Sequence, residues 1–350
     1  MRKLIIAVLL ILGVYCAAGM SAMNCNQSSN DEHRHSFSSE WSFDNDNHWK
    51  ACTGKNCEEV DSLSAHEREG KICTVCGHEE GAIKAKPSNA VSVINSASDG
   101  TTVKLERGAY GILSIAPVGK NLKLEFAENS SATSITIGGQ VTNLTIEGVK
   151  VTEYISINDR FDGLTIKDCK FSGNFEINNT NYNGEEFNKD FVIEGCTFTN
   201  IASTQNKTAI KMKAVENLTL KDNIFNGVQY NCYQAPGGKI PSADNPNGVP
   251  SLKGDIVITG NTFKDVGYSV LNLNRVHASS CDISNNVFYL NTICYIDIEV
   301  DEGADINVYG VVIGVNTWEE IPEGNQDNFN FWDTGAYTYD PTEQILLEAE

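Results

Sequence analysis

From residue 89 to residue 317, apolar residues alternate with polar ones, and long stretches with helical spacing are absent. Alternation with a period of two is typical of a strand that buries one face. The exception is residues 90–97, where the spacing predicts one short helix. The pattern therefore predicts an all-β domain that begins with a short helix.

The alternating segments repeat one motif, a strand followed by a tight polar turn and a second strand. Residues 143–151 (NLTIEGVKV) and 163–171 (GLTIKDCKF) begin 20 residues apart. Further copies lie at 191–198, 217–225, 255–263 and 281–288. A unit of this size cannot bury its own apolar face, so stacked units must share a continuous core.

Stacking places equivalent side chains above one another, about 4.8 Å apart. We therefore expect an internal aromatic ladder, an asparagine ladder in the turns, and two cysteines in the same turn slot as small buried residues. In that order, these residues are Phe171, Phe198, Phe225, Phe263 and Phe288; Asn223, Asn261 and Asn286; Cys169 and Cys196.

The start of this region is similar to a known family. Residues 91–100 (VSVINSASDG), 102–105 (TVKL) and 108–110 (GAY) resemble the N-terminal cap and first coil of pectin-lyase-like proteins. The resemblance implies a right-handed, single-stranded parallel β-helix over residues 89–317. Residues 318–350 are then expected to be a C-terminal cap and acidic tail.

In this family the third strand of each coil usually forms the exposed binding face. The alternation predicts two outward columns of polar residues, suited to hydrogen bonding with sugar hydroxyls and equally to contact with solvent. The predicted columns are Ser156, Glu176, Lys211, Asn272 and Asp297, and Asn158, Asn178, Lys213, Asn274 and Glu299.

A proline- and glycine-rich stretch between Phe225 and Asp255 predicts a long loop, which on a rigid scaffold commonly carries recognition. Tyr230 and Tyr233 within it are candidates for stacking on sugar rings, although a surface loop without a ligand would fit as well. Cys232 could pair with another thiol, but the sequence identifies no partner. Cys281 and Cys294 have no role that the sequence assigns.

Residues 33–84 differ in composition and contain five of the six histidines. Cys52, Cys57, Cys73 and Cys76 have the spacing C-x4-C followed by C-x2-C, which suits a tetrahedral zinc site. We predict one structural Zn²⁺ bound by these four cysteines. The candidate substitutes are His48, His66 and His78. Two disulfides are the alternative, because exported chains meet an oxidising compartment.

Residues 73–78 (CTVCGH) resemble a zinc-ribbon knuckle, and the wider histidine, tryptophan and cysteine pattern is similar to small modules on bacterial surface proteins. The resemblance implies an exported bacterial protein, secreted or attached to the cell surface.

The N-terminus predicts the same compartment. Arg2 and Lys3 precede an apolar run that ends at Ala18, which indicates a signal peptide at residues 1–22 followed by a polar tether at 23–32. The run is too short to favour spanning a membrane, and no later transmembrane span is predicted. Cys16 or Cys25 could carry a lipid anchor, although neither has the residues usual before an acylated cysteine; cleavage and release is the alternative.

The charge narrows the range of partners. A formal net charge of −20 disfavours nucleic acid, whose phosphates need clusters of Lys and Arg. A polyuronate would also be repelled unless a cation or a basic patch reversed the local field.

Catalysis is the last question that the sequence addresses. The Gly-His-Gly motif of pectin-lyase-like hydrolases is absent, since His277 lies in Val-His-Ala. A Ca²⁺-dependent lyase acting on uronate polymers would need Lys211 or Lys213 as the base, although neighbouring carboxylates would keep either lysine protonated. We therefore predict a non-catalytic, surface-associated protein that binds an extracellular polysaccharide or another polymer. The alternatives are the lyase and a structural stalk or adhesin.

Overall fold

The computed structural model describes most of the chain between residues 34 and 348. The described ranges are 34–43, 46–69, 72–179, 186–202, 208–236, 250–274, 276–289, 294–299, 311–313, 315–319, 329–332, 337–340 and 345–348. The predicted signal peptide and tether lie outside them, as do Cys16 and Cys25. Within these ranges no helix has the length and apolar character needed to cross a membrane. The chain divides into two compact units, residues 1–42 with 47–65 and residues 43–46 with 66–350.

The first unit contains a small antiparallel sheet. Strand β2 (Asn47–Ala51) pairs with β3 (Val60–Ala65), and the two-residue strand β1 (Ser42–Phe43) completes the order β1-β2-β3. Phe37 forms an isolated antiparallel bridge with Cys52. All six residues of β3 are exposed, so this sheet has little apolar core of its own.

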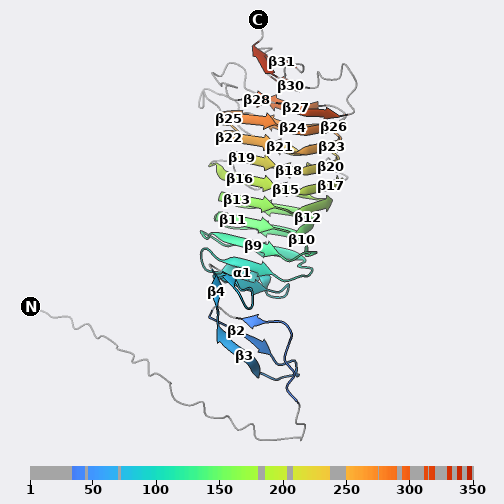
Figure 1. Cartoon of the computed structure of the whole chain (residues 1–350). Coiled ribbons are helices and arrows are strands. Elements are labelled where there is room, and N and C mark those ends of the chain that lie inside the picture. Colours follow the sequence, from blue (N-terminus) through green and yellow to red (C-terminus); the bar gives the residue numbers. More distant parts are fainter. Residues whose placement is uncertain are drawn as a thin grey trace, which may run out of the picture. The chain divides into compact units, whose positions relative to one another are not determined.

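The second unit is a solenoid of parallel strands, which confirms the predicted parallel β-helix (Figure 1). One face is a continuous ten-stranded sheet in which strands from successive coils pair in parallel. Its strands are β6 (Ala82–Ala85), β7 (Thr102–Leu105), β9 (Leu122–Phe126), β11 (Val141–Glu147), β13 (Phe161–Lys167), β16 (Asn188–Glu194), β19 (Val215–Lys221), β22 (Leu252–Thr259), β25 (Val276–Ser284) and β28 (Val311–Ile313).

Two further faces meet at the long strand β12 (Lys150–Ile157). Its first residues pair with the second face, and its later residues pair with the third. The second face contains β14 (Lys170–Gly173), β17 (Thr197–Ile201), β20 (Ile224–Val228), β23 (Thr262–Val266), β26 (Val287–Tyr289) and β29 (Thr317–Glu319). The third contains β8 (Ile112–Ile115), β10 (Ser131–Ile137), β15 (Glu176–Asn178), β18 (Ile210–Lys211), β21 (Tyr233–Ala235), β24 (Ser269–Asn274), β27 (Cys294–Glu299) and β30 (Phe329–Trp332).

The solenoid extends beyond the predicted bounds of 89 and 317. Strand β6 lies within the segment assigned to the metal module and pairs in parallel with β7. At the other end, β30 pairs in parallel with β27. Outside the coils, β4 (Arg68–Glu69) pairs with β5 (Ile72–Cys73), and β31 (Tyr337–Asp340) pairs with β32 (Ile345–Glu348), both antiparallel. Short strands have weak sequence patterns, so only their pairing in the structure shows whether they are part of the solenoid.

The predicted N-terminal helix is present as α1 (Ala90–Ser96). Ala90 and Ile94 are buried in the same hydrophobic cluster as the first coils. The helix therefore covers apolar side chains at the beginning of the solenoid core, as a cap is expected to do.

The predicted phenylalanine ladder is confirmed. All five rings are fully buried and in register, one per coil. Adjacent ring centroids lie 4.7, 4.5, 5.2 and 5.0 Å apart from Phe171 to Phe288. These separations are typical of stacked aromatic pairs, which add to the free energy gained by burial.

The asparagine ladder is confirmed and is longer than predicted, because Asn316 extends it. Asn261 is typical: its Oδ1 accepts from the backbone N–H of Asn223 at 3.0 Å, and its Nδ2 donates to the carbonyl of Leu220 at 2.8 Å. Each side chain thus satisfies buried backbone groups of an adjacent coil that would otherwise lose their hydrogen bonds to water.

Cysteine takes the place of asparagine in two earlier coils, as predicted. The Cys196 sulfur accepts from the backbone N–H of Cys169 at 3.4 Å. The same thiol lies 3.5 Å from the carbonyl of Ile166, which is equivalent to the Leu220 carbonyl two repeats later. Both thiols are buried, and they form weaker versions of the asparagine hydrogen bonds.

Candidate metal centres and polar face

The predicted zinc-ribbon knuckle is a tight turn that joins β5 to the solenoid. The N–H of Cys73 donates to the carbonyl of His78 at 2.7 Å, and the N–H of Gly77 donates to the carbonyl of Cys73 at 2.9 Å. Gly77 has a φ of +70°, a left-handed conformation that costs glycine little. The turn places the thiols of Cys73 and Cys76 on the same side.

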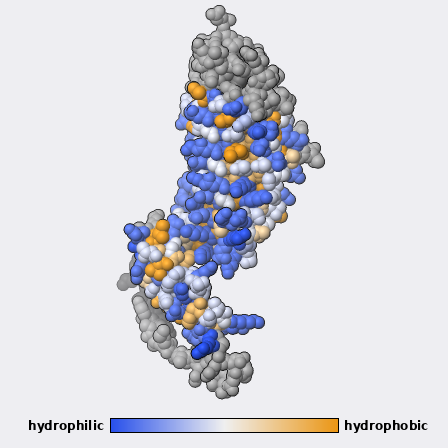
Figure 2. All heavy atoms as spheres, turned by 45° about the vertical axis from the view of Figure 1, so that its right-hand side comes forward, coloured by the Kyte–Doolittle hydropathy of each residue, from blue (hydrophilic) through white to orange (hydrophobic). Residues whose placement is uncertain are grey.

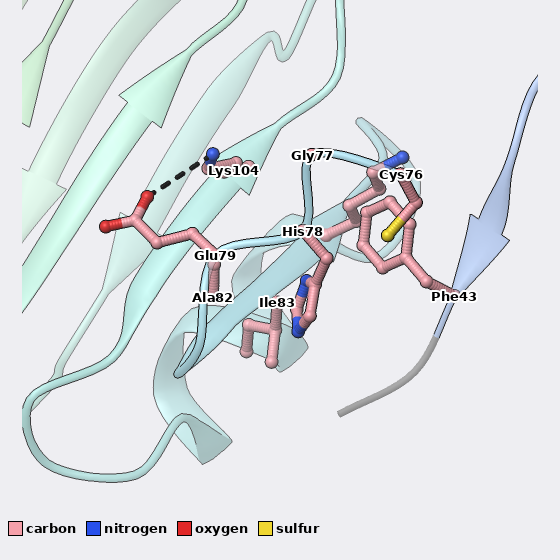
Figure 3. A pocket seen from close by; sticks show the side chains of 9 residues that line it. Phe43, Cys76, Gly77, His78, Glu79, Ala82, Ile83 and Lys104 are labelled. Carbon is pink, nitrogen blue, oxygen red and sulfur yellow. Dashed lines mark ion pairs between the residues drawn. The ribbon is translucent and has the colours of Figure 1, made fainter. Parts of the chain in front are cut away.

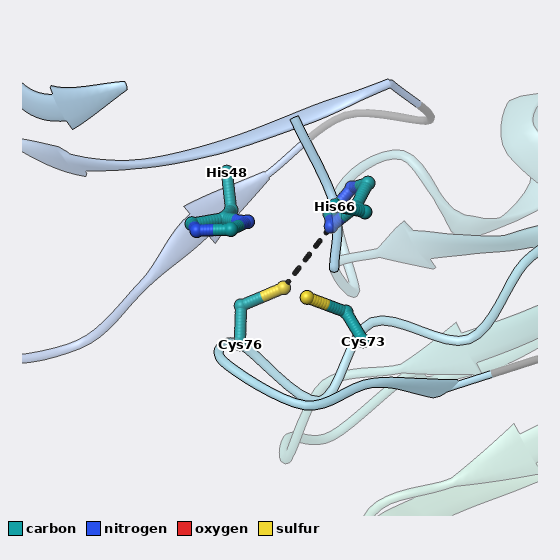
Figure 4. A group of neighbouring side chains, drawn as sticks. All are labelled: His48, His66, Cys73 and Cys76. Atoms are coloured by element: carbon teal, nitrogen blue, oxygen red, sulfur yellow. Dashed lines mark hydrogen bonds between the residues drawn. The ribbon is translucent and has the colours of Figure 1, made fainter. Parts of the chain in front are cut away.

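His66 completes a cluster with these thiols (Figure 4). The Sγ atom of Cys76 lies 3.4 Å from Nδ1 of His66, and the ligand atoms of all three residues lie within 4.8 Å of one another. A tetrahedral Zn²⁺ with ordinary bond lengths separates a sulfur ligand from a nitrogen ligand by about 3.6 Å. The cluster therefore has the residue types and the spacing of a zinc site.

The two thiols of the knuckle differ in electrostatic environment. Desolvation raises the pKa of Cys73, but the backbone N–H of Cys76 and the imidazole of His66 outweigh it and lower that pKa to about 6. Desolvation raises the pKa of Cys76, and the neighbouring Cys73 raises it further. Two adjacent thiolates repel each other, so a divalent cation is needed to hold both in the ionised form.

A second cluster lies entirely in the first unit. Nδ1 of His35 is 3.3 Å from Sγ of Cys57 and 3.7 Å from Sγ of Cys52, and all three ligand atoms lie within 4.8 Å of one another. The sequence prediction did not include His35 among the ligands. Its position near the start of the histidine-rich segment was the only signal, and the isolated bridge between Phe37 and Cys52 that brings it to the cysteines is not apparent in the pattern.

None of the four predicted ligand cysteines, all of which lie in the described part of the chain, is in a disulfide, and each pair has a histidine beside it. Cys52 and Cys57 are grouped with His35, whereas Cys73 and Cys76 are grouped with His66. Among the residues that the structure describes, His/Cys groups that could hold a metal ion are therefore present, and they include histidine as well as the predicted cysteines.

The other two candidate histidines are buried. His48 lies on β2, where its Nε2 is 3.0 Å from the hydroxyl of Ser64 and its ring meets the edge of Trp41. His78 follows the knuckle, and its ring centroid is 4.7 Å from that of His66 and 4.6 Å from that of Phe43.

A cavity of about 230 Å³ adjoins the knuckle in the second unit (Figure 3). Cys76 and His78 line one side, and residues of β6 line another. Lys104 forms an ion pair with Glu79 at 3.4 Å, and the ammonium group of Lys84 lies 4.1 Å from the centre of the Phe43 ring. Lys104 is thus paired with a carboxylate, and Lys84 with an aromatic ring.

The third face carries a polar column, but the predicted register is shifted by two residues at β15. Ser156 pairs with Asn178 rather than Glu176, and Asn178 pairs with Lys211. Glu176 lies opposite Tyr154. The shift arises because Phe175, predicted to lie in the inward column of this strand, stacks on Phe171 at 4.2 Å and fills the corner.

Strand β21 was also missed, and it changes the neighbours of the candidate base. Gln234 of β21 pairs with Lys211 on one side and Asn272 on the other. Lys211 therefore lies between amides in the column and has no carboxylate beside it there. Asn272, almost wholly buried, pairs with Asp297, and Asn274 pairs with Glu299. Lys213 follows β18, and Asn179 holds its backbone through hydrogen bonds of 2.7 and 2.9 Å.

The predicted tyrosine-bearing recognition loop is partly wrong. Tyr233 lies in β21 and is completely buried, and burial raises the pKa of its hydroxyl. Tyr230 stacks on Tyr268, with ring centroids 4.6 Å apart. Cys232 is buried and free, so no disulfide forms there, and residues 237–249 lie outside the described residues. The apolar environment of the third face draws Tyr233 inward.

The described surface of the solenoid is largely hydrophilic in the view of Figure 2, with hydrophobic side chains scattered among polar ones. Within the described part of the chain, the groups of three or more His, Cys, Asp or Glu residues close enough to share a metal ion are the two His/Cys clusters.

Comparisons with known proteins give matches among solved structures. No protein-family model matches the chain, and no curated protein matches it. Among solved structures, the chain is similar to the catalytic unit of a thermostable GH87 α-1,3-glucanase from Streptomyces thermodiastaticus strain HF3-3. The identity is 11%, the match covers 75% of this chain and 69% of that one, and the TM-score is 0.28.

The predicted function, non-catalytic binding of an extracellular polymer, is corrected here. The solved structure reported above is a catalytic unit. The buried Tyr233 removes one of the two stacking residues of that prediction. At a TM-score of 0.28, the similarity assigns no activity to this chain. The metal clusters are thus the candidate sites with defined chemistry.

Proposed function

We propose that the His/Cys segment is a zinc-binding module and that the ion held by His66, Cys73 and Cys76 is structural. The observation that carries this proposal is the spacing of the ligand atoms. The sulfur and nitrogen atoms of Cys76 and His66 stand 3.4 Å apart, close to the separation of about 3.6 Å around tetrahedral zinc. Two thiols with one imidazole form a donor set that zinc commonly binds.

The position of the cluster favours a structural role over a catalytic one. The knuckle leads through Glu79, which bridges to Ile72, directly into the first strand of the solenoid. Few large apolar side chains are buried here, and Ile72 and Val75 are 56% and 39% exposed. A metal ion would supply the folding free energy that this small apolar core does not provide.

Structural zinc has four protein ligands, so one more is needed beside the three residues of this cluster. The sequence offers His48 and His78 as the remaining predicted histidines. Replacing each by alanine distinguishes them. Loss of zinc in one variant identifies the fourth ligand, and retention of zinc in both shows that neither histidine is required for binding.

The test is native mass spectrometry of the full chain, produced in a zinc-containing medium and compared with a Cys76→Ser variant. We expect the variant to lose one zinc ion, because serine is a poor ligand for zinc at neutral pH. Cys281→Ala is the matched control: this cysteine is buried on β25, outside both clusters, and its replacement should leave the zinc content unchanged. An unchanged zinc content in Cys76→Ser, or a disulfide between Cys73 and Cys76 in the wild type, would overturn the proposal.

A further inference from the structure

We infer that His35, Cys52 and Cys57 form a second, separate zinc site, so that the chain binds two zinc ions rather than the one predicted from its four cysteines. This inference goes beyond the proposed function and does not depend on it. The three residues belong to one unit of the chain, and the three residues of the knuckle cluster belong to the other.

The backbone around this second cluster holds His35 beside the cysteine loop. The N–H and the hydroxyl of Thr53 both donate to the carbonyl of Ser36, at 2.7 and 2.9 Å. The N–H of Ser38 donates to the carbonyl of Ala51 at 2.9 Å. These bonds align residues 36–38 with residues 51–53, which places His35 beside the loop that carries Cys52.

The loop between the cysteines has the features of a metal-binding turn. The N–H of Cys57 donates to the carbonyl of Gly54 at 3.2 Å, which closes the turn, and Asn56 has a φ of +59°. The N–H of Gly54 points at the Cys52 sulfur at 3.4 Å. A backbone N–H that donates to sulfur stabilises the thiolate, which is the form of cysteine that binds metal.

The ligand separations also match zinc. The distances from Nδ1 of His35 to the two sulfurs, 3.3 and 3.7 Å, lie on either side of the separation of about 3.6 Å around a tetrahedral ion. One nitrogen atom is thus close to both thiols at once.

Exposure distinguishes the two sites. His35 is exposed, and Cys52 and Cys57 are half-buried, whereas Cys73 in the knuckle is 1% exposed. A chelator competes for a metal through its open coordination positions. The zinc at His35, Cys52 and Cys57 should therefore leave first, and the zinc of the knuckle should leave second.

The test counts zinc ions by native mass spectrometry of the full chain. We expect two ions in the wild type, one in Cys57→Ser, one in His35→Ala, one in Cys76→Ser, and none in the Cys57→Ser/Cys76→Ser double variant. Arg34→Ala is the matched control for His35, because it changes the exposed neighbouring residue and should retain both ions.

Three results would overturn this inference. A wild type with one zinc ion that both Cys57→Ser and Cys76→Ser remove would show a single shared site. An unchanged zinc content in both Cys57→Ser and His35→Ala would show that these residues bind no metal. A wild-type disulfide between Cys52 and Cys57, two hydrogen masses lighter than the free thiols, would assign them to a cross-link. None of these depends on the outcome at the knuckle unless the site is shared.

A measurement on the wild type alone avoids the effects of substitution on folding. Thiol alkylation, mapped by peptide mass spectrometry, is followed while a chelator is added stepwise. We expect Cys52 and Cys57 to become reactive together when the first zinc ion leaves, and Cys73 and Cys76 when the second leaves. Immediate reactivity of Cys52 and Cys57 before any chelator is added would contradict a metal at this site.

Discussion

The solenoid and the His/Cys segment obtain their stability in different ways. In the solenoid, every coil from Phe198 to Phe288 places a fully buried ring on the ring of the coil before it. In the segment before it, β3 exposes all six of its residues, and Leu63 is 60% exposed. One region is held by apolar side chains that repeat, and the other has histidines and cysteines where a core would be.

This difference shows that the free energy of folding depends on how many neighbouring coils or strands a segment packs against. A coil with neighbours above and below buries its apolar residues on both sides, so stability grows with each repeat. A short segment with one antiparallel pair of strands has no such neighbours, and cross-links or metal ions must replace them. The clustering of His35, Cys52 and Cys57 fits that requirement.

Metal removal should have the largest effect, and it should affect the two regions differently. A structural zinc ion contributes about 10 kcal/mol or more to the folding of small modules. With a chelator at neutral pH, we expect β2 and β3 to lose their amide protection in hydrogen–deuterium exchange, while the strands from β11 to β25 keep theirs. Restoring zinc should restore the protection. Equal protection of β2 with and without metal would show that the segment is stable by itself.

A cavity in the aromatic ladder should have the next largest effect. Phe225 is fully buried between Phe198 and Phe263, so Phe225→Ala should lower the free energy of unfolding by about 3–5 kcal/mol. The matched control is Ile224→Ala, because Ile224 is 47% exposed and its replacement should cost less than about 1 kcal/mol. Denaturant unfolding followed by circular dichroism measures both. Similar losses for the two variants would contradict the ladder as the main stabilising element.

A substitution in the asparagine ladder measures how much buried hydrogen bonds, rather than apolar contacts, contribute to stability. Asn261→Ala leaves the N–H of Asn223 and the carbonyl of Leu220 without their partner, and each unsatisfied buried group costs about 1–3 kcal/mol. We expect a loss of about 3 kcal/mol in the same denaturation experiment. Asn261→Cys should cost less than alanine, because Cys196 makes the equivalent contacts two coils earlier. The exposed Asn226→Ala is the control. A cysteine variant no more stable than the alanine variant would show that the thiol does not replace the amide.

Surface charges on the first face should have the smallest effect. Lys123 lies 2.9 Å from Glu147, and their side chains are 42% and 26% exposed. Solvent screens such pairs, so Lys123→Ala should cost about 0.5 kcal/mol, and less at high salt. The Glu147 carboxylate raises the pKa of Lys123, so this contribution is complete below the ordinary lysine pKa of about 10.4 and is lost as the pH rises through the higher folded value. A loss comparable to that of Phe225→Ala would show that the charged face is as important as the core.

Patterns that repeat along the chain could be predicted from the sequence. The ladder positions of Phe198 and Asn261, and the helix at Ala90–Ser96, were predicted correctly because each repeat copies the same local rule. The third face was harder. Phe175 and Ile177 both alternate with polar residues, and only packing against Phe171 decided which of the two filled the corner.

The metal ligands also include some that the sequence predicted and one that only the folded structure revealed. The sequence identified the cysteines and His66 as ligand candidates through their type and spacing, but it did not identify His35. That residue reaches Cys57 only because residues 36–38 align with residues 51–53, which is a pairing between segments about 15 residues apart. Spacing along the chain predicts ligands that lie within one turn. Ligands that come from paired segments cannot be predicted until the pairing is known.

The sequence by itself determined the repeat, its register on the first two faces, and the chemical character of the N-terminal segment. These follow from alternation and residue type, which act locally and recur in every coil. Only the tertiary structure decided that Tyr233 is a core residue, that Gln234 lies between Lys211 and Asn272, and which histidine accompanies each pair of cysteines. Each of these depends on which side chain best fills a space that other segments create, and that space does not exist until the chain has folded.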